Sequence, residues 1–299
     1  MSWPEPEPSW NRFEARVLKV DHPREDHCLV VLEAPLIARR GKPGQFVHVR
    51  VGGEGFPVLR RPLSVAAFHP DRGEIELFFR IVGRGTKWLA QRKANDLLDL
   101  LGPLGRGFPT GPGGPWLLVG GGIGSAPLLS LAQAAQRRRI PVVVLLGAKQ
   151  QAELVLASRF GELDARVHVA TDDGSMGVKG PVTSLLADQL KQNEPPAVVY
   201  ACGPKPMLKK VKEMTRGQAF PCYLSLEERM ACGVGACLGC SCAAETTGTA
   251  RATTCTEGGT GCENLVQENK VTDLLPGPVG YVRVCVDGPV FEAGEVSLD

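Results

Sequence analysis

The chain has 299 residues, of which 43% are hydrophobic and 22% are charged, and its net charge is +2. The length predicts two or three domains, and the composition is typical of a globular protein. A nearly neutral net charge does not favour binding to the negatively charged backbone of nucleic acid. No apolar run approaches the roughly 20 residues of a membrane helix, and the N-terminus lacks the pattern of a secretion signal. We therefore expect a cytoplasmic protein that binds neither nucleic acid nor membrane.

Short strand-like runs follow a tail of residues 1–11 and are separated by Gly- and Pro-containing turns. Several short strands at this spacing are typical of a small barrel. We expect strands at 16–20, 28–33, 45–51, 63–67 and 75–81, and one helix at 86–94. The predicted first domain is an N-terminal antiparallel β-barrel over residues 12–112.

The pattern changes after a Pro/Gly linker at 110–115. Apolar runs alternate with helical patterns, which indicates a parallel sheet covered by helices on both faces. The strands are expected at 116–119, 142–147, 166–171 and 197–202, and the helices at 125–138, 151–160, 182–191 and 205–216. This α/β domain is predicted over residues 113–218, and a small Cys-rich domain over 219–299.

Eight of the ten cysteines lie between Cys222 and Cys285, which favours metal ligation over disulfides in a chain without a secretion signal. Cys232, Cys237 and Cys240 have the C-x4-C-x2-C spacing of plant-type [2Fe–2S] ferredoxins. The glycines between them allow a tight loop whose amides approach the sulfurs. A structural zinc site is the alternative.

Four cysteines are candidates for the fourth ligand, and Cys242 is too close to Cys240 to reach the far side of a cluster easily. Cys255 and Cys262 lie in a Thr/Gly-rich stretch. Cys285 lies on a strand-like segment, which would place a ligand more accurately than a loop. On that ground Cys285 is modestly favoured.

Two features of the barrel suit phosphate binding. The sequence Arg60-Arg61-Pro62-Leu63-Ser64 enters a strand, where an Arg fork could hold a pyrophosphate and the Ser64 hydroxyl could meet a ring nitrogen. An ordinary Arg-Pro turn explains the same letters. Gly83 to Thr86 opens the expected helix, whose first amides could bind an anion.

Two loops of the α/β domain suit a dinucleotide. The sequence Gly120-Gly121-Gly122-Ile123-Gly124-Ser125 follows a strand and opens a helix, which is the context of a phosphate loop. The sequence Cys202-Gly203-Pro204-Lys205-Pro206-Met207 follows the last strand, at the edge where open α/β sheets bind ligands. Cys202 could lie at the nicotinamide or could be a small buried residue.

Together these motifs resemble the ferredoxin–NADP reductase superfamily and, within it, the electron-transfer subunits of two-component dihydroorotate dehydrogenases. The matching stretches are Arg61–Ser64, Val82–Thr86, Gly102–Phe108, Gly120–Pro127, Thr171–Ser175, Gly180–Thr183, Cys202–Met207, Glu227–Cys237 and Val284–Phe291. The resemblance covers residues 13–299.

The resemblance implies FAD, a [2Fe–2S] cluster and NAD(H) as cofactors. Arg61 would hold the FAD pyrophosphate, Ser64 would polarise the flavin, and Gly85 and Thr86 would cradle phosphate. The remaining implied flavin residues are Pro62, Leu63, Phe78, Phe79 and Arg80. The implied NAD(H) residues are Gly120, Gly121, Gly122, Gly124, Ser125, Cys202, Gly203, Pro204 and Met207, with Ser64 and Cys202 as the catalytic pair.

The implied cluster ligands are Cys232, Cys237, Cys240 and Cys285, and the implied partner is an FMN-containing dihydroorotate dehydrogenase in a heterotetramer. The chain departs from the family in having 44 residues between Cys240 and Cys285, so that about 244–280 is an insertion. Two rivals stay open: another NAD(P)H-dependent flavin and iron–sulfur enzyme, of the ferredoxin:NADP or sulfide dehydrogenase type, and a non-catalytic zinc protein. Lys149 leaves NAD and NADP open.

Overall fold

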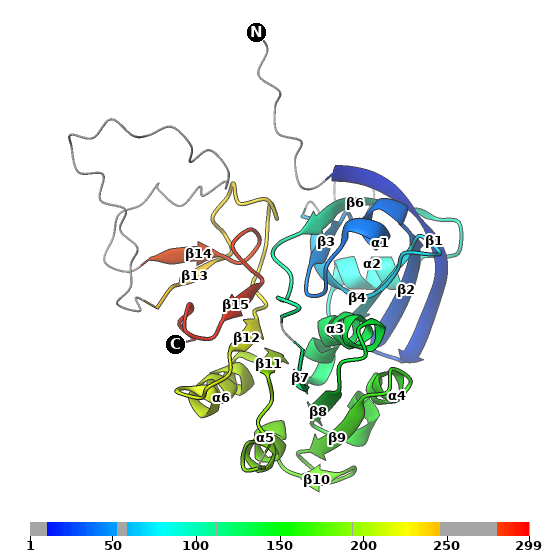
Figure 1. Cartoon of the computed structure of the whole chain (residues 1–299). Coiled ribbons are helices and arrows are strands. Elements are labelled where there is room, and N and C mark those ends of the chain that lie inside the picture. The colour runs from blue at the N-terminus through cyan, green and yellow to red at the C-terminus, as the bar shows by residue number, and fades with distance from the viewer. Residues whose placement is uncertain (1–10, 53–58, 112, 193, 246–279, 299) are drawn as a thin grey trace, which may run out of the picture.

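The computed structural model describes residues 11–52, 59–111, 113–192, 194–245 and 280–298. The first part of the chain forms a closed antiparallel barrel with the strand order β1-β2-β5-β4-β3-β6 (Figure 1). Its strands are β1 (Asn11–Arg24), β2 (His27–Glu33), β3 (Phe46–Val49), β4 (Arg61–His69), β5 (Glu74–Arg80) and β6 (Leu97–Leu104). The predicted barrel is therefore confirmed.

The barrel also contains elements that the sequence pattern did not reveal. Strand β6 closes the barrel by pairing with β1 and β3, although no strand was expected at 97–104. The prediction of a single helix was wrong, because α1 (Pro35–Arg40) precedes α2 (Arg84–Ala90). A six-residue helix is too short to show a helical period, and Gly102 and Pro103 disguise the end of β6.

The second part is a mainly parallel sheet of seven strands, in the order β10-β9-β8-β7-β11-β12-β15. Its central strands are continuous apolar runs, as strands buried on both faces require. The strands are β7 (Trp116–Gly121), β8 (Val142–Ala148), β9 (Arg166–Thr171), β10 (Val178–Lys179), β11 (Val198–Cys202), β12 (Cys222–Ser225) and β15 (Val290–Glu292). The expected α/β architecture is confirmed.

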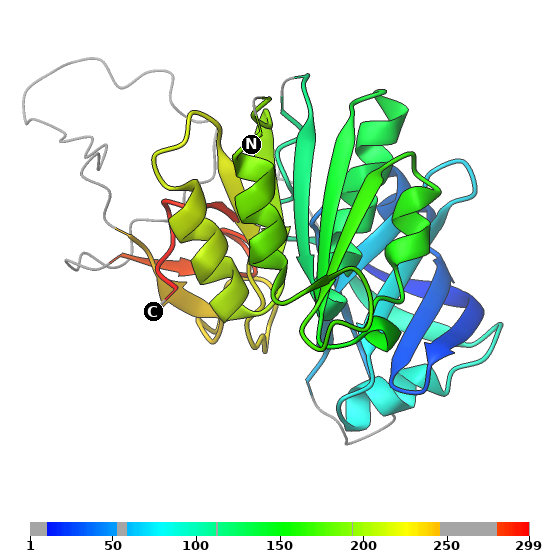
Figure 2. The ribbon, with the colours of Figure 1, turned by 90° about the horizontal axis from the view of Figure 1, so that it is seen from below.

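Helices cover both faces of this sheet (Figure 2). Residues of α3 (Ala126–Arg137) and α4 (Ala157–Gly161) pack into one core, and residues of α5 (Val182–Leu190) and α6 (Lys205–Thr215) pack into another. The helix expected at 151–160 is broken in the structure, because a 3-10 turn at Gln151–Glu153 precedes the short α4. Another 3-10 turn, Gly122–Ser125, leads into α3.

The Cys-rich part is tied to the sheet, because β12 pairs with β11 and β15 pairs with β12. Its other strands, β13 (Ser241–Ala243) and β14 (Tyr281–Arg283), form an antiparallel hairpin. The amide of Ala244 donates to the carbonyl of Gly280 at 2.8 Å, so both ends of the insertion meet at the hairpin tip. The insertion itself, with Cys255 and Cys262, lies outside the described residues.

Polar contacts join the barrel to the sheet. The carboxylate of Glu76 on β5 lies 2.6 Å from the Arg159 guanidinium on α4 and 2.8 Å from the His69 ring on β4. Two hydrogen bonds join Phe68 to helix α3: the Phe68 amide donates to Gln133 Oε1 at 3.2 Å, and Arg137 donates to the Phe68 carbonyl at 2.8 Å. Buried charge pairs fix geometry when both partners are present, so this joint sets how the two parts face each other.

No helix among the described residues is both long enough and apolar enough to cross a membrane.

Candidate functional site

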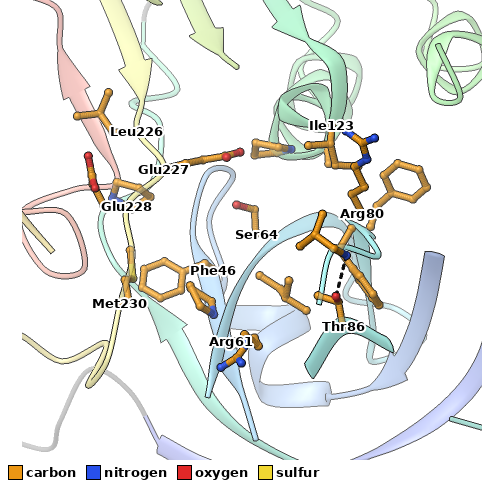
Figure 3. A pocket seen from close by; sticks show the side chains of 18 residues that line it. Phe46, Arg61, Ser64, Arg80, Thr86, Ile123, Leu226, Glu227, Glu228 and Met230 are labelled. Carbon is orange, nitrogen blue, oxygen red and sulfur yellow. Dashed lines mark hydrogen bonds between the residues drawn. The ribbon is translucent and has the colours of Figure 1, made fainter. Parts of the chain in front are cut away.

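The first cavity lies between the barrel, the start of α3 and the segment that follows β12 (Figure 3). Its volume is about 380 Å³, within the range of small-molecule sites. Eight of the nine barrel residues predicted for the flavin line it together, namely Arg61, Pro62, Leu63, Ser64, Phe78, Phe79, Arg80 and Thr86, whereas Gly85 does not line it. The structure therefore brings strands β4 and β5 and helix α2 to one site.

The two adjacent arginines have different environments. Arg60 donates to the Asp99 carboxylate at 2.8 Å and to the Asp99 carbonyl at 2.9 Å, and so it ties β4 to β6. Arg61 lines the cavity and donates to the Leu59 carbonyl at 2.7 Å. A Cβ built on Gly85 would lie 2.9 Å from Arg61 Nε, so any other residue here would have to displace the Arg61 side chain.

Thr86 holds the loop that enters α2. Its hydroxyl oxygen accepts a hydrogen bond from the amide of Val82 at 3.0 Å (Figure 3). It also accepts from the amide of Gly83 at 3.0 Å, and the hydroxyl donates to the Gly83 carbonyl. These bonds satisfy amides that a helix start leaves without partners. The threonine therefore shapes the cavity wall by ordering the loop.

The second cavity, of about 460 Å³, opens at the carboxyl ends of the parallel strands. The strand order reverses between β7 and β11, and ligands of open α/β sheets bind at such a switch point. Six predicted NAD(H) residues line it: Gly121, Gly122, Gly124, Gly203, Pro204 and Met207. A Cβ on Gly124 would lie 2.6 Å from the Gly203 Cα, so the two loops pack too closely for side chains.

Three other predicted NAD(H) residues lie beneath this cavity and do not line it. Ser125 is 6% exposed and donates to the Gly122 carbonyl at 2.9 Å, which closes the turn. Gly120 packs against Ser125, where a Cβ would lie 3.0 Å from the serine Cβ. Cys202 is 1% exposed, and burial raises the pKa of its thiol. This thiol is thus placed to support the loop that carries Gly203.

The two cavities share three lining residues: Arg80 from the barrel, Ile123 from the glycine loop and Glu227 after β12. Burial raises the pKa of the Glu227 carboxyl. Arg80 is held by the Asp26 carboxylate, which accepts from its Nε at 3.0 Å. Ligands in the two cavities would meet at this shared wall, which contains both a cation and a carboxyl group.

Some lining residues were absent from the predicted site. Glu227, Glu228 and Met230 line the first cavity. The sequence could have indicated them, because they lie in the stretch Glu227–Cys237 that matches the family. Others are Phe46 in the first cavity, and Lys149, Glu153 and Asp172 in the second. Asp172 lies in the matching stretch Thr171–Ser175, whereas no motif contains Glu153, and only the strand order places the two carboxylates at one opening.

The cysteine loop sorts its sulfurs into two neighbouring pairs. In the first pair, the amide of Cys237 donates to Cys232 Sγ at 3.4 Å. In the second, the amide of Cys285 donates to Cys240 Sγ at 3.4 Å. Positive φ angles at Gly233 (73°), Gly235 (83°) and Leu238 (57°) wrap the loop tightly around the first pair.

Backbone amides of this loop favour thiolates. The amides of Val234 and Cys237 donate to Cys232 and lower the pKa of that thiol to about 7, although burial acts in the opposite direction. Burial and the neighbouring Cys240 raise the pKa of Cys285 to about 12. Metal binding requires thiolates, and the amides on Cys232 favour that form, whereas Cys285 would lose its proton only beside a positively charged metal centre.

The residues fit a [2Fe–2S] cluster, because two irons need two pairs of thiolates and sulfurs that accept amide hydrogen bonds. Among the described side chains, no three or more His, Cys, Asp or Glu groups are arranged around the point that a single metal ion would occupy. The fit therefore rests on the two thiol pairs and their amides. Cys242 lies elsewhere, lining a separate cavity of about 150 Å³ with Lys205 and Leu298.

Comparison with known proteins agrees with this geometry. The oxidoreductase NAD-binding domain family matches residues 118–213, and the iron–sulfur cluster binding domain of dihydroorotate dehydrogenase B matches residues 227–259. The electron transfer subunit of dihydroorotate dehydrogenase B (NAD(+)) from Geobacillus thermodenitrificans is 41% identical over 273 residues, which are 90% of this chain and 92% of that protein. Its counterpart from Desulforamulus reducens is 41% identical over 285 residues, 95% and 97% of the two chains.

A solved NADH-dependent reduced ferredoxin-NADP oxidoreductase matches 95% of this chain and 90% of its own, with a TM-score of 0.76 and 28% identity. A Neisseria gonorrhoeae ferredoxin NADP+ reductase, solved with FAD and NADP, shares the fold at a TM-score of 0.57 and 21% identity, over 71% of this chain and 93% of its own.

Fold and relatives together define a subunit of an NAD(P)-linked flavin and iron–sulfur oxidoreductase. The chain belongs to the family of electron transfer subunits of dihydroorotate dehydrogenase B.

Proposed function

We propose that this protein passes electrons between an FMN-dependent dihydroorotate dehydrogenase and NAD+ through a [2Fe–2S] cluster and FAD, in pyrimidine biosynthesis. The observation that carries the proposal is the chain of adjacent sites. The two cavities share Arg80, Ile123 and Glu227, and the segment Leu226–Met230 leads from the first cavity to the cysteine loop. FAD, when bound, would exchange electron pairs with nicotinamide and single electrons with the cluster.

The residues predicted for the flavin have distinct roles in this proposal. Arg61 binds the FAD pyrophosphate, since its guanidinium forms charge-assisted hydrogen bonds with phosphate. Pro62, Leu63, Phe78 and Phe79 supply apolar surface for the flavin ring, and Ser64 and Arg80 supply polar contacts at its edge. Gly85 and Thr86 order the helix start against the phosphates.

The second cavity binds NAD(H) in this proposal. The loops Gly121–Gly124 and Gly203–Met207 approach each other closely enough to hold a pyrophosphate on backbone groups, with Gly120, Ser125 and Cys202 supporting them from below. Cys202 therefore acts through the loop position, and Ser64 acts at the flavin. Glu153 and Asp172 place carboxylates in the same cavity as Lys149, and carboxylates disfavour the extra phosphate of NADP.

The cluster is proposed to be held by Cys232, Cys237, Cys240 and Cys285, with its exposed edge toward the partner subunit. Cys237 and Leu238 are exposed, whereas Cys240 and Cys285 are buried. The partner would be the FMN-containing catalytic subunit in a heterotetramer. We propose that the three functional parts are residues 12–112, 113–218 and 219–299, and that the complex works in the cytoplasm.

The test is to co-express the chain with an FMN-containing dihydroorotate dehydrogenase subunit from the same organism and to purify the complex anaerobically. The expected result is a yellow-brown complex that contains FAD, FMN and two irons per copy of this chain and reduces NAD+ with dihydroorotate. If no FMN protein co-purifies and dihydroorotate leaves the flavin oxidised, the assignment to pyrimidine biosynthesis fails. A colourless protein that contains zinc would refute the whole electron-transfer proposal.

The second candidate is an NADH-dependent ferredoxin:NADP oxidoreductase, which the 95% coverage of this chain by such a structure favours. The identity of 28% to that structure is lower than the 41% to the dihydroorotate dehydrogenase subunits. Assaying the purified complex with reduced ferredoxin and NADP+ separates the two, because only the second candidate predicts activity with that pair.

A further inference from the structure

Strand β3 separates the first cavity from the cysteine loop. Phe46 and His48 point to the same face of this strand, because residues two apart share a face. Phe46 lines the first cavity and packs in the same core as Cys240 and Cys285. Val47 and Val49 point the other way, into the barrel core. The face of β3 that carries His48 is therefore the wall between the proposed flavin and the proposed cluster.

His48 is completely buried, with 0% of its surface exposed. Neither ring nitrogen has a hydrogen-bond partner at normal distance among the described residues. A buried polar group without a partner costs about 1–3 kcal/mol. A valine or leucine at this position would avoid that cost, so the imidazole has a use that apolar packing does not explain.

The cysteine loop lies directly on this ring. A Cβ built on Gly233 would be only 2.6 Å from His48 Nδ1, and it would be 3.1 Å from Cε1. Gly233 has a φ of 73°, so the loop passes the ring in a conformation that glycine adopts easily. Two backbone groups lie close enough to interact with the ring, that of Arg60 and that of Cys232, the neighbour of Gly233. A small movement of the cysteine loop would let the imidazole N–H donate to the Cys232 carbonyl.

We propose that His48 is a positioning residue for the cluster: its ring sets the distance of the Cys232–Gly233 segment from the barrel and donates a hydrogen bond to the Cys232 carbonyl. This inference rests on the proposed cluster site. Its consequence is that His48 helps to set the balance of the one-electron exchange in which the cluster loses an electron and the flavin gains it. Hydrogen bonds and packing around cluster ligands are known determinants of cluster potential.

The test compares variants of the purified complex by redox titration of the cluster. Reduction of the cluster is monitored by electron paramagnetic resonance (EPR). His48→Phe keeps a ring but removes the N–H, and we expect the equilibrium constant for reducing the cluster to change about tenfold, which is about 59 mV for one electron. His48→Asn keeps an N–H near the position of Nδ1, and we expect it to stay within about twofold of the wild type.

Val49→Ala is the matched control, because Val49 is equally buried on the same strand and faces the barrel core. We expect it to lower thermal stability and to leave the EPR spectrum and the potential unchanged. If His48→Phe does not fold, His48→Leu replaces it as the variant without an N–H.

Three results would overturn the inference. An N–H-free variant with an unchanged spectrum and potential refutes the role of His48 while leaving the cluster assignment intact. An equal shift in Val49→Ala shows that general loosening of β3 causes the effect. A wild-type complex without a [2Fe–2S] spectrum refutes the proposed function and this inference together.

Discussion

Removal of the Glu76 charge is expected to destabilise the joint between the barrel and the sheet. Glu76 is 7% exposed and contacts both Arg159 and His69. Burial opposes its ionisation, but the bonds from His69 and Arg159 prevail and lower the pKa of its carboxyl from 4.5 to about 2. A shift of this size corresponds to about 3 kcal/mol of unfolding free energy, since one pKa unit is about 1.4 kcal/mol.

The sign of the pH dependence follows from the lowered pKa. The stabilisation is fully present above pH 4.5 and is lost as the pH falls toward 2. About two-fifths is lost one pH unit below the unfolded-state pKa. Glu76→Gln should therefore lower the unfolding free energy by about 3 kcal/mol at pH 7, and the difference from the wild type should shrink in acid.

Urea unfolding between pH 7 and pH 3.5 measures this effect. Glu74→Gln is the matched control, because Glu74 lies on the same strand and pairs with Arg72, whose side chain is 59% exposed. That exposed pair should contribute about 1 kcal/mol or less. The reasoning is refuted if both substitutions cost the same at pH 7, or if the cost of Glu76→Gln does not change with pH.

Four further predictions concern the proposed cofactor sites. Arg61→Ala should weaken FAD binding about tenfold or more, measured by flavin release on dilution, because it removes charge-assisted bonds of about 1.5–3 kcal/mol; retained flavin would argue against the phosphate role. Leu238→Asp should weaken the complex with the catalytic subunit by about 2 kcal/mol in calorimetry, because Leu238 is 53% exposed beside the proposed cluster. The EPR spectrum should not change, because Asp tolerates the positive φ of this position. Cys285→Ser should abolish or rebuild the cluster spectrum while Cys242→Ser preserves it, and the reverse result would reassign the fourth ligand. Replacing residues 246–279 by Asn-Gly should leave the cluster spectrum unchanged, because Ala244 and Gly280 are already hydrogen-bonded neighbours; loss of iron would show that the insertion contributes to the cluster.

Local sequence patterns were sufficient to predict those parts of the structure in which a residue type has one strong structural requirement. Most barrel strands could be predicted because polar and apolar residues alternate along them, and the central strands of the sheet because they are continuous apolar runs. The cluster site could be predicted because its loop needs a fixed cysteine spacing. The broken helix at 151–160 shows the limit of this reasoning. Its residues favour a helix, yet the structure has a 3-10 turn at Gln151–Glu153 and a separate short helix at Ala157–Gly161. Propensity is a weak guide that tertiary context can override.

The site was harder to predict wherever identical residues take different roles. Arg60 and Arg61 are adjacent and chemically equal, and only the position of Asp99 on β6 makes the first structural and leaves the second at the cavity. Cys202 lies in a motif at the edge of the sheet where ligands bind, yet its strand β11 is buried along its whole length and the thiol is buried with it. Which face a residue occupies is decided by pairing partners far away in the sequence.

The proposed insertion can be long without disturbing the proposed cluster site, because both of its ends lie at the tip of the β13–β14 hairpin. Strands β13 and β14 pair between the proposed cluster and the two ends of this segment, with Ser241 opposite Arg283. The Arg283 guanidinium then reaches the Gly235 carbonyl at 3.3 Å and the Asp287 carboxylate at 3.2 Å, which fixes the turn that carries Cys285. Beyond it, β15 returns to the large sheet. The proposed fourth ligand is thus held by rigid elements on both sides, and the length of chain between the hairpin ends adds only a small closure entropy.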